Sequence, residues 1–499
     1  MMKIELPEGP WRVVLDVAQA RGVPIWIVGG AVRDHLLGRP VHDWDFAVDR
    51  DAMAIARAVG DALGGAFFPL DEQRGTARVV LGTEQNAPVE LDFARLRGGS
   101  LSADLAMRDF TVNAMAVNEA GTLIDQLGGQ RDLRDRQIRA TSERAFRDDP
   151  ARLLRAPRLE AELCLRIEPQ TEAWIRRDAP LLPRPAAERV RDELVRGLAV
   201  SGASGFIQRL GDLGLLVHVL PEIESLKGVT QSYPHRFDVW RHTLIVTDAL
   251  EVVVASIVGD STRLGLYPAL DVPPAAWGDL TRVIGQFAEE MRVHLSVAVS
   301  SGRDRRLLLK LGGLLHDIGK PQTRSVDEDG HIHFYNHEPV GARMAAARLR
   351  MLRFSRHEVQ RMSTMVKGHL RPSHLTCAEG VTRRAIYRYF RDQGDAGVDV
   401  VLLGLADHLA TWGPNLREER WMRRLEVAEL LLHHYFERRA ETVDPQLPVD
   451  GHDLMCELGL EPGPQIGLLL DTLREAMAAG EIETREDALA LAALVSGLG

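Results

Sequence analysis

The sequence predicts an α+β protein, in which a small mixed sheet near the N-terminus is followed by helices through to the C-terminus. Two observations predict this fold class. An apolar run at residues 25–28 and two further segments that read as strands, at residues 78–81 and 89–93, lie in the first hundred residues, with glycine and proline between them. After them Arg, Leu and Ala dominate and aromatic residues are few, at 5% of the chain, which favours helices.

Length sets the number of domains. A single hydrophobic core stops growing near about 250–300 residues, so a chain of 499 residues is expected to form about three or four domains. We predict a head, a helical neck, a second helical domain and a helical tail, at residues 1–140, 141–228, 229–425 and 426–499.

The formal net charge of −10 argues against a protein that coats nucleic acid with its whole surface. The three cysteines are far apart and form no CxxC pair, so we expect no disulfide framework and no thiolate zinc site. The sequence shows no signal-peptide pattern and no apolar run long enough to span a membrane. A cytoplasmic protein without membrane contact is therefore expected.

The first site candidate is the stretch at residues 25–49, IWIVGGAVRDHLLGRPVHDWDFAVD. Gly29 and Gly30 stand between a strand and a helix, where backbone N–H groups can approach a phosphate. Asp43 and Asp45 alternate along the next strand and so share one face. Asp92, on the strand at residues 89–93, supplies a third carboxylate. A phosphate cradle beside convergent carboxylates suits Mg²⁺-dependent phosphoryl transfer.

This combination resembles the signature of class II tRNA nucleotidyltransferases (CCA-adding enzymes) and bacterial poly(A) polymerases. The resemblance implies a polymerase-β-like head, with Asp43, Asp45 and Asp92 catalytic and Mg²⁺ bound by the first two. RDFTVNA, at residues 108–114, resembles the second motif of the family. The nucleotide-binding residues implied by these two motifs are Gly29, Gly30, Arg33, Asp34, Arg108, Asp109 and Asn113.

An arginine-rich stretch follows the head, with nine arginines against five acidic residues at 131–158. Basic side chains beside a phosphate-handling site suit contacts with an RNA backbone. Within this stretch, RDDPARLLR resembles the EDxxR helix of the same family. We expect Asp149 and Arg152, three residues apart, to share one helix face. There the carboxylate would accept from the amino group of cytosine or adenine, and the guanidinium would donate to the ring nitrogen.

Arg155 and Arg158 complete the predicted nucleotide-binding set of this helix. Pro157 lies between them, and a proline inside a helix is expected to kink it. The exact positions of the two arginines therefore depend on the size of that kink.

A second metal site is predicted from histidines and aspartates spread over the later helices. KLGGLLHDIGKP contains adjacent His316 and Asp317, and the set resembles the H…HD…D pattern of the HD phosphohydrolase superfamily. The resemblance implies one metal bound by His242, His316, Asp317 and Asp407, with His337 and His369 available for a second metal or for substrate phosphate. Imidazole and carboxylate ligands suit Mn²⁺, Ni²⁺, Fe²⁺ or Mg²⁺.

The predicted function is template-independent addition of C and/or A to tRNA 3′ ends, from CTP and ATP, with phosphohydrolase activity as a second capacity. Only six residues, GGSLSA, separate Arg97 from Asp104. A segment this short resembles relatives that add only the two cytidines. Addition of CC alone and poly(A) synthesis are alternatives within the class. A phosphohydrolase with a vestigial head and an RNA-binding protein without either activity are alternatives outside it. The sequence leaves the oligomeric state open.

Overall fold

The computed structural model describes residues 3–4, 9–41, 43–82, 89–259, 270–300, 302–377 and 380–496. The chain forms two compact units. Unit 1 comprises Met1–Gly197 and Asp212–Val219, and unit 2 comprises Leu198–Gly211 and Leu220–Gly499. The predicted head lies in unit 1 with most of the predicted neck, and the two later predicted domains lie in unit 2. The finer division into four domains stays a prediction.

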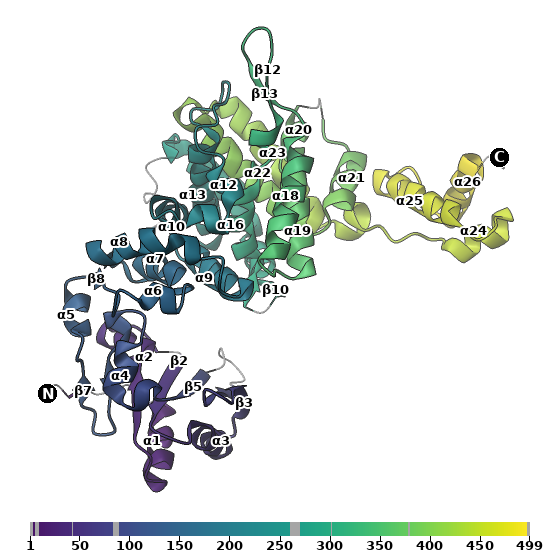
Figure 1. Ribbon diagram of the computed structural model, residues 1–499. Helices are drawn as coiled ribbons and strands as arrows, with labels where there is room; N and C mark the ends of the chain where they lie inside the picture. The colour runs from purple at the N-terminus through teal and green to yellow at the C-terminus, as the bar shows by residue number, and fades with distance from the viewer. Residues whose placement is uncertain are drawn as a thin grey trace. The chain divides into compact units, whose positions relative to one another are not determined.

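Unit 1 is built on a seven-stranded mixed sheet in the order β3-β4-β5-β2-β1-β6-β7, which confirms the predicted α+β class (Figure 1). Strands β2 and β5 pair in parallel, and the other neighbouring pairs are antiparallel. The strands are β1 (Ile25–Val28), β2 (Asp43–Val48), β3 (Ala66–Asp71), β4 (Thr76–Leu81), β5 (Val89–Arg95), β6 (Ala116–Val117) and β7 (Leu123–Ile124).

Short helices connect these strands and continue into the neck. Helix α3 (Ala52–Leu63) ends at Gly64, which is in the left-handed conformation. A short parallel pair, β8 (Gln137–Ile138) and β9 (Arg166–Ile167), accompanies the neck helices. The helices of this unit are α1 (Trp11–Ala20), α2 (Gly30–Leu36), α3 (Ala52–Leu63), α4 (Leu101–Ala106), α5 (Gly129–Arg134), α6 (Ala145–Asp148), α7 (Arg152–Leu163), α8 (Pro169–Asp178), α9 (Ala187–Ala199) and α11 (Leu216–Val219), with the 3₁₀ turns η1 (Arg97–Gly99), η2 (Thr111–Asn113) and η3 (Ala179–Leu181).

In its described residues, unit 2 is helical apart from two small strand pairs, β10 (Ala298–Ser300) with β11 (Arg303–Asp304) and β12 (Arg324–Val326) with β13 (Ile332–Phe334). The helices are α10 (Ala203–Asp212), α12 (Pro221–Glu224), α13 (Val239–Val258), α14 (Pro274–Ile284), α15 (Ala288–Ser296), α16 (Arg305–Leu315), α17 (Lys320–Thr323), α18 (His337–Met351), α19 (Arg356–Gly368), α20 (Arg371–Thr376), α21 (Arg383–Gln393), α22 (Ala396–Trp412), α23 (Glu418–Phe436), α24 (Gly451–Leu458), α25 (Pro464–Ala479) and α26 (Arg485–Ser496), with the short turns η6 (Gly285–Phe287), η7 (Gly413–Asn415) and η8 (Arg439–Val443).

The core of unit 2 explains why α13, α16 and α22 are apolar on most sides. Leu250, Leu309 and Leu402, from these three helices, belong to one buried cluster that also contains Trp421. A Cβ atom at Gly313 would lie 2.6 Å from Leu250 Cδ1, so the glycine lets α16 approach α13 closely. This approach brings the end of α16 beside the first turn of α13, where the predicted metal ligands lie.

The tail helices α24–α26 have an apolar cluster of their own, which includes Leu454, Leu469 and Leu473. Helix α25 also meets α21 through ion pairs of Glu475 with Arg384 and Arg388. The tail is therefore a packed helical element of unit 2, as the sequence predicts.

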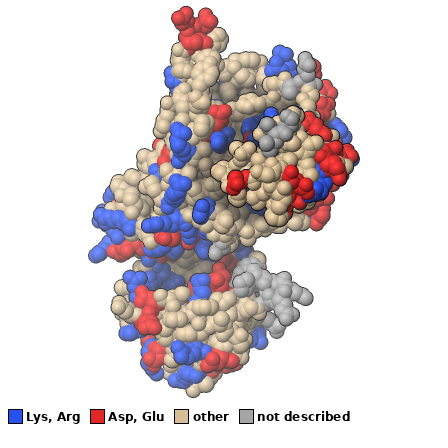
Figure 2. Space-filling view, turned by 90° about the vertical axis from the view of Figure 1, so that its right-hand side faces the viewer, with Lys and Arg blue, Asp and Glu red and all other residues tan. Residues whose placement is uncertain are grey.

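The surface is mixed in charge, with basic and acidic side chains interspersed over the face in Figure 2. Cys164, Cys377 and Cys456 are exposed and unpaired, which agrees with the prediction of no disulfide framework. Within the described ranges, no helix combines the length and the apolar composition needed to cross a membrane.

Candidate functional site

The three predicted carboxylates of the head lie on adjacent parallel strands. Asp45 on β2 is in register with Asp92 on β5, and Asp43 is in register with Glu90. Residues paired in register on neighbouring strands have side chains on the same face of the sheet. The sequence analysis missed Glu90, although it stands two residues before Asp92, in the same alternation that joins Asp43 to Asp45.

This face carries more negative than positive charge. Burial raises the pKa of Asp45 to about 6, and the charges of Asp92 and Asp43 add to that rise against the opposing charge of Arg108. Arg78, on β4, binds Asp92 with two hydrogen bonds of 2.7 and 2.8 Å and pairs with Glu90 at 2.5 Å. The carboxylates around Asp45 thus fit a divalent cation, since a cation would relieve their mutual repulsion.

The glycine pair brings the backbone against Asp45. Gly29 has φ of +76°, and a Cβ atom there would lie 2.8 Å from Asp45 Oδ2 and 3.0 Å from Arg108 Nη1. A side chain at this position would therefore displace both groups. The strand–turn–helix predicted from IWIVGGAVRD is present, with Gly29 before the first residue of α2.

A continuous chain of hydrogen bonds joins the predicted nucleotide-binding residues of the head to the neck. Arg33 Nη1 donates to Asn113 Oδ1 at 2.7 Å, and the Asn113 amide donates to Asp109 Oδ1 at 3.1 Å. Asp109 Oδ2 accepts from Arg155 Nη1 at 3.0 Å. Although burial acts in the opposite sense, the charge of Arg155 lowers the pKa of Asp109 to about 2. Asp34 joins the chain through two hydrogen bonds from Arg33.

Glu193, on α9, fixes the arginines of α7. Its carboxylate accepts from Arg155 Nε at 2.8 Å and from Arg158 Nε at 2.7 Å. Helix α7 runs without interruption from Arg152 to Leu163 although it contains Pro157, so the proline does not end it. Sequence reasoning missed Glu193, because it is one of three acidic residues in α9 and nothing in the local sequence sets it apart from the other two.

The predicted geometry of Asp149 and Arg152 is wrong in one respect. Asp149 has φ of −147° and ψ of 94°, which is extended backbone before α7, so the two residues do not share a helix face. They still converge, with Arg152 Nε 3.8 Å from Asp149 Oδ2. The turn at Pro150 therefore brings the two side chains together, a result that was expected from helical spacing.

Both side chains also have partners within unit 1. Arg152 donates to the carbonyl oxygens of Met107 and Arg108 at 2.9 and 3.2 Å, and Arg189 Nη2 lies 2.8 Å from Asp149 Oδ2. They line a basic pocket of about 780 Å³, whose arginines are Arg74, Arg97, Arg147, Arg152, Arg184 and Arg189. This pocket suits phosphate groups beside a carboxylate–guanidinium pair.

The short segment from Arg97 to Asp104 is tightly folded. Arg97 Nε donates to Asp104 Oδ1 at 2.7 Å, and Ser100 caps α4 by accepting from the Ala103 N–H. Arg108 Nε donates to the other oxygen of Asp104 at 3.2 Å. The segment is thus a compact turn tied to Arg108, beside Gly29.

The second site is in unit 2, where the predicted histidines and aspartates converge from α13, α16, α18, α19 and α22. His242 Nε2 lies 3.0 Å from Asp407 Oδ1 and 3.6 Å from Asp317 Oδ2. His316 Nε2 lies 3.1 Å from Asp317 Oδ2. Two groups of three could each hold an ion and share Asp317, namely His242, His316 and Asp317, and Asp317, His337 and His369.

Backbone carbonyls orient three of these rings. The Nδ1 atoms of His316, His337 and His369 lie 2.7–2.8 Å from the carbonyl oxygens of residues 313, 334 and 366. A carbonyl can only accept, so each Nδ1 carries the proton and each Nε2 presents a lone pair. These lone pairs face Asp317 oxygens at 3.1–3.8 Å.

This arrangement fits a bound cation, because buried lone pairs facing a carboxylate repel one another without one. The Nε2 atoms of His242 and His316 are buried and make no hydrogen bond of normal geometry within the described structure. All six residues predicted for this site therefore lie together.

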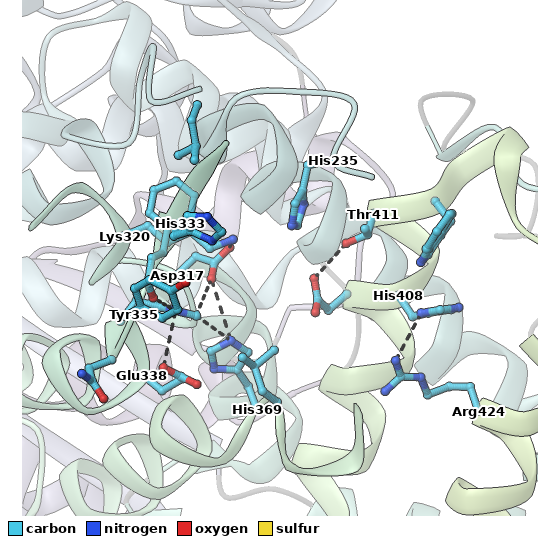
Figure 3. A pocket seen from close by; sticks show the side chains of 17 residues that line it. His235, Asp317, Lys320, His333, Tyr335, Glu338, His369, His408, Thr411 and Arg424 are labelled. Atoms are coloured by element: carbon cyan, nitrogen blue, oxygen red, sulfur yellow. Dashed lines mark hydrogen bonds and ion pairs between the residues drawn. The ribbon is translucent and has the colours of Figure 1, made fainter. Parts of the chain in front are cut away.

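A pocket of about 470 Å³ opens onto these ligands. Figure 3 shows Asp317, His369 and Tyr335 on one side of it, with His408 and Arg424 across from them. Lys320 Nζ lies 2.7 Å from Asp317 Oδ2 and donates to Gln231 Oε1 at 2.7 Å. The sequence analysis did not assign Lys320 a role, although it lies three residues after Asp317.

Three family models match separate parts of the chain. The model of the Poly A polymerase head domain matches residues 25–139. The model described as a probable RNA and SrmB-binding site of polymerase A matches residues 164–227, and that of the HD domain matches residues 281–412.

Relatives match along nearly the whole chain. The A-adding tRNA nucleotidyltransferase of Deinococcus radiodurans is 36% identical over 470 residues, which cover 93% of this chain and 94% of the relative. The CC-adding tRNA nucleotidyltransferase of Geobacter sulfurreducens is 33% identical, over 95% of this chain and 93% of the relative. A solved structure, described as the complex of CCA-adding enzyme with CTP, has a similar fold, with a TM-score of 0.60 at 20% identity over 98% of this chain and 94% of that one.

Proposed function

The chain belongs to the tRNA nucleotidyltransferase family, and from this premise we propose that it adds C and/or A to the 3′ ends of tRNA, with CTP and ATP as donors. It is an enzyme, as its sequence predicts. The observation that carries the proposal is the register of β2 with β5, which sets Asp45 beside Asp92 against Gly29. We also propose that it works in the cytoplasm, in keeping with its three unpaired cysteines.

Asp43 and Asp45 would hold Mg²⁺, which would neutralise the triphosphate and support departure of pyrophosphate. Asp92 would accept the proton of the RNA 3′-hydroxyl, with Arg78 fixing the direction of its carboxylate. The hydroxyl oxygen attacks the α-phosphorus, the bond to the β-phosphate oxygen breaks, and pyrophosphate leaves. Gly29 and Gly30 would leave room for the phosphates, with Arg33, Asp34, Arg108, Asp109 and Asn113 around them.

Asp149 and Arg152 would choose the base. A carboxylate that accepts from an exocyclic amino group favours C and A, because U and G offer a carbonyl at that position. Arg155 and Arg158, held by Glu193, would stabilise the same end of the nucleotide. The arginines of the basic pocket would contact the tRNA backbone, whose phosphates attract guanidinium groups.

Within this activity, the compact segment from Arg97 to Asp104 favours addition of the two cytidines alone. The segment is tied down at both ends. It leaves little chain to rearrange when the incoming base changes from C to A.

Nucleotide incorporation tests these proposals. tRNA without its CCA end and tRNA ending in CC are each incubated with CTP, ATP or both, and the added residues are identified. CC-only addition predicts two cytidines on the first tRNA and no product on the second. A single A on the second tRNA would contradict it, and a long A tail would indicate a poly(A) polymerase. Asp45→Asn is expected to abolish incorporation and keep tRNA binding, whereas unchanged incorporation would refute the head assignment.

A metal-dependent phosphohydrolase is the second candidate function, favoured by the buried lone pairs that face Asp317. The six ligands would hold Mn²⁺, Ni²⁺, Fe²⁺ or Mg²⁺, which would make a bound water acidic enough to act as a nucleophile. Water oxygen attacks the phosphorus of a phosphate ester, the ester P–O bond breaks, and the alcohol leaves with a proton. His316→Ala is expected to remove phosphate release and lower the metal content, with incorporation unchanged. Metal content equal to that of the parent would refute the site.

A further inference from the structure

The head sheet carries an exposed aromatic ring that the proposed chemistry does not use. Phe68 lies on β3, which is an edge strand of the seven-stranded sheet, beside α3 (Figure 1). Its side chain is 49% exposed. Single exposed apolar residues are common on protein surfaces, so the position of this ring decides whether it has a role.

Strand register places Phe68 on the same face of the sheet as the predicted carboxylates. Phe68 is paired with Arg78 on β4. Arg78 is paired in turn with Asp92 on β5, and Asp92 with Asp45 on β2. Residues in register on neighbouring strands have side chains on one face. The four side chains therefore form one row across the sheet.

The residue before Phe68 identifies the opposite face. Arg57, on α3, lies over the ring of Phe67 at 4.9 Å, and a Cβ atom at Gly60 would lie 3.7 Å from Phe67 Cβ. Val79, which is paired with Phe67, is fully buried. Helix α3 thus covers the face that holds Phe67. Since successive side chains of a strand point to opposite faces, Phe68 points away from α3.

The row leads from the triphosphate side of the site to Phe68. At one end Gly29 approaches Asp45, where we propose that the triphosphate binds. At the other end Phe68 lies two strand spacings beyond Asp92, which is about 10 Å. The proposed acceptor hydroxyl lies at Asp92, between the two ends. Because the triphosphate occupies one end, the nucleoside that carries the hydroxyl is left with the end at Phe68.

The charge of this face selects the part of an RNA that fits it. Asp43 and Glu90 stand beside the row, and Arg78 is already paired with Glu90 and Asp92. An RNA backbone along this face would bring its phosphates against carboxylates, and like charges repel. The 3′-terminal nucleoside has no phosphate on its 3′ side, and its base is neutral. A terminal nucleoside is therefore the part of an RNA that suits this face.

The edge of β3 is unsuited to a further protein strand. Pro69 has no N–H group to donate, and the register with β4 shifts between Pro69 and Asp71. A proline and a bulge on an edge strand both disfavour the addition of another strand. The exposed ring thus favours a flat ligand over a strand of a second protein.

We infer that Phe68 stacks on the base of the 3′-terminal nucleotide of the acceptor RNA and so positions the 3′-hydroxyl at Asp92. This inference rests on the proposed function and adds a positioning residue to it. Stacking tolerates every base, because each base has a π-face. It therefore suits an acceptor end whose last base changes as nucleotides are added. Loss of one such contact weakens binding by about 5- to 150-fold, which corresponds to about 1–3 kcal/mol.

The experiment compares two RNA probes by fluorescence anisotropy on the full chain, without nucleotide. The first is tRNA lacking its CCA end, and the second is the same tRNA with an abasic ribose as its last residue. Phe68→Ala is expected to weaken binding of the first by about 5- to 150-fold and to leave the second unchanged. Phe68→Tyr keeps a ring and is expected to keep both affinities. Contacts with the rest of the tRNA are common to both probes and cancel in the comparison.

Incorporation of CTP gives a second measurement. Phe68→Ala is expected to raise KM for tRNA by the same factor and to leave KM for CTP unchanged, because the ring contacts the acceptor and not the donor. Leu70→Ala is the matched control, since Leu70 is an exposed residue of the same strand, at 55%, without an aromatic ring. It is expected to change neither KM.

Equal weakening of both probes by Phe68→Ala, or an unchanged affinity for the first, would overturn the inference. A raised KM for CTP alone would also overturn it, because the ring would then contact the donor base. So would a dimer of the parent in sedimentation that Phe68→Ala dissociates, since the ring would then face a second copy. Absence of incorporation by the parent would refute the proposed function, while a Phe68-dependent preference for the intact 3′ end would still support the contact with RNA.

Discussion

Replacing Gly29 by alanine tests whether the head site is assembled as described. The backbone conformation at Gly29, φ +76° and ψ −137°, is one that glycine adopts readily and L-residues avoid. Alanine there is expected to cost about 1–3 kcal/mol of stability. Its Cβ would also stand 2.8 Å from Asp45 Oδ2, closer than real Cβ contacts come, so the carboxylate must move.

The functional loss follows from that displacement. A misplacement of about 1 Å in a catalytic group can cost about 100-fold in rate, which corresponds to about 2.7 kcal/mol. We therefore expect kcat/KM for CTP incorporation into tRNA lacking its CCA end to fall by about 100-fold. The measurement uses saturating tRNA, with circular dichroism to show that the variant is folded.

Gly38→Ala is the matched control. Gly38 also has positive φ, +66°, but a Cβ atom there would meet nothing within 4 Å. It is expected to lose about 1–2 kcal/mol of stability from the backbone alone and to keep its incorporation rate. If Gly29→Ala and Gly38→Ala have the same kcat/KM, the close approach of Gly29 to Asp45 has no functional part and the reasoning fails.

Three further predictions concern the neck and the metal cluster. Glu193→Ala removes one partner of a buried ion pair, and the free energy of opening of α7 and α9, measured by amide hydrogen exchange, is therefore expected to fall by about 3–5 kcal/mol. An unchanged free energy of opening would exclude a structural role for this carboxylate. Arg189→Ala frees Asp149 from a half-exposed ion pair and is expected to lower KM for CTP by up to about fivefold, whereas a raised KM would show that Arg189 itself binds the nucleotide. Mn²⁺ at about a hundred times its Kd is expected to stabilise unit 2 by about 2.7 kcal/mol in thermal unfolding, and an equal shift in His316→Ala would contradict binding at that cluster.

Local sequence was sufficient wherever chemistry depends on spacing along one element. The alternation of Asp43 with Asp45 predicts a shared strand face, and β2 has it. The glycine pair predicts a strand–turn–helix, and the turn is present at Gly29. Asp125 holds the turn before α5 in the same local way, by accepting from the N–H groups of Gly129 and Gln130.

Residue spacing gave a wrong prediction where the backbone conformation changes between neighbouring residues. Asp149 and Arg152 were assigned to one helix from their separation of three, but Asp149 is extended and the helix begins only at Arg152. Pro150 causes this, because the residue before a proline is disfavoured in helical conformation. The kink at Pro157 stays a prediction. The positions of Arg155 and Arg158, on either side of it, are fixed by Glu193, a carboxylate on another helix.

The sequence by itself determined the types of groups present and their order: glycines before a helix, alternating carboxylates, and a His-Asp pair directly after an apolar helix. Tertiary structure alone decided which of these groups meet. Arg78 reaches Asp92 only because β4 pairs with β5, and Glu193 reaches Arg155 only because α9 packs against α7. Contacts of this kind join residues far apart in the chain. Their positions follow from the packing of apolar faces, which cannot be predicted from the local sequence around either residue.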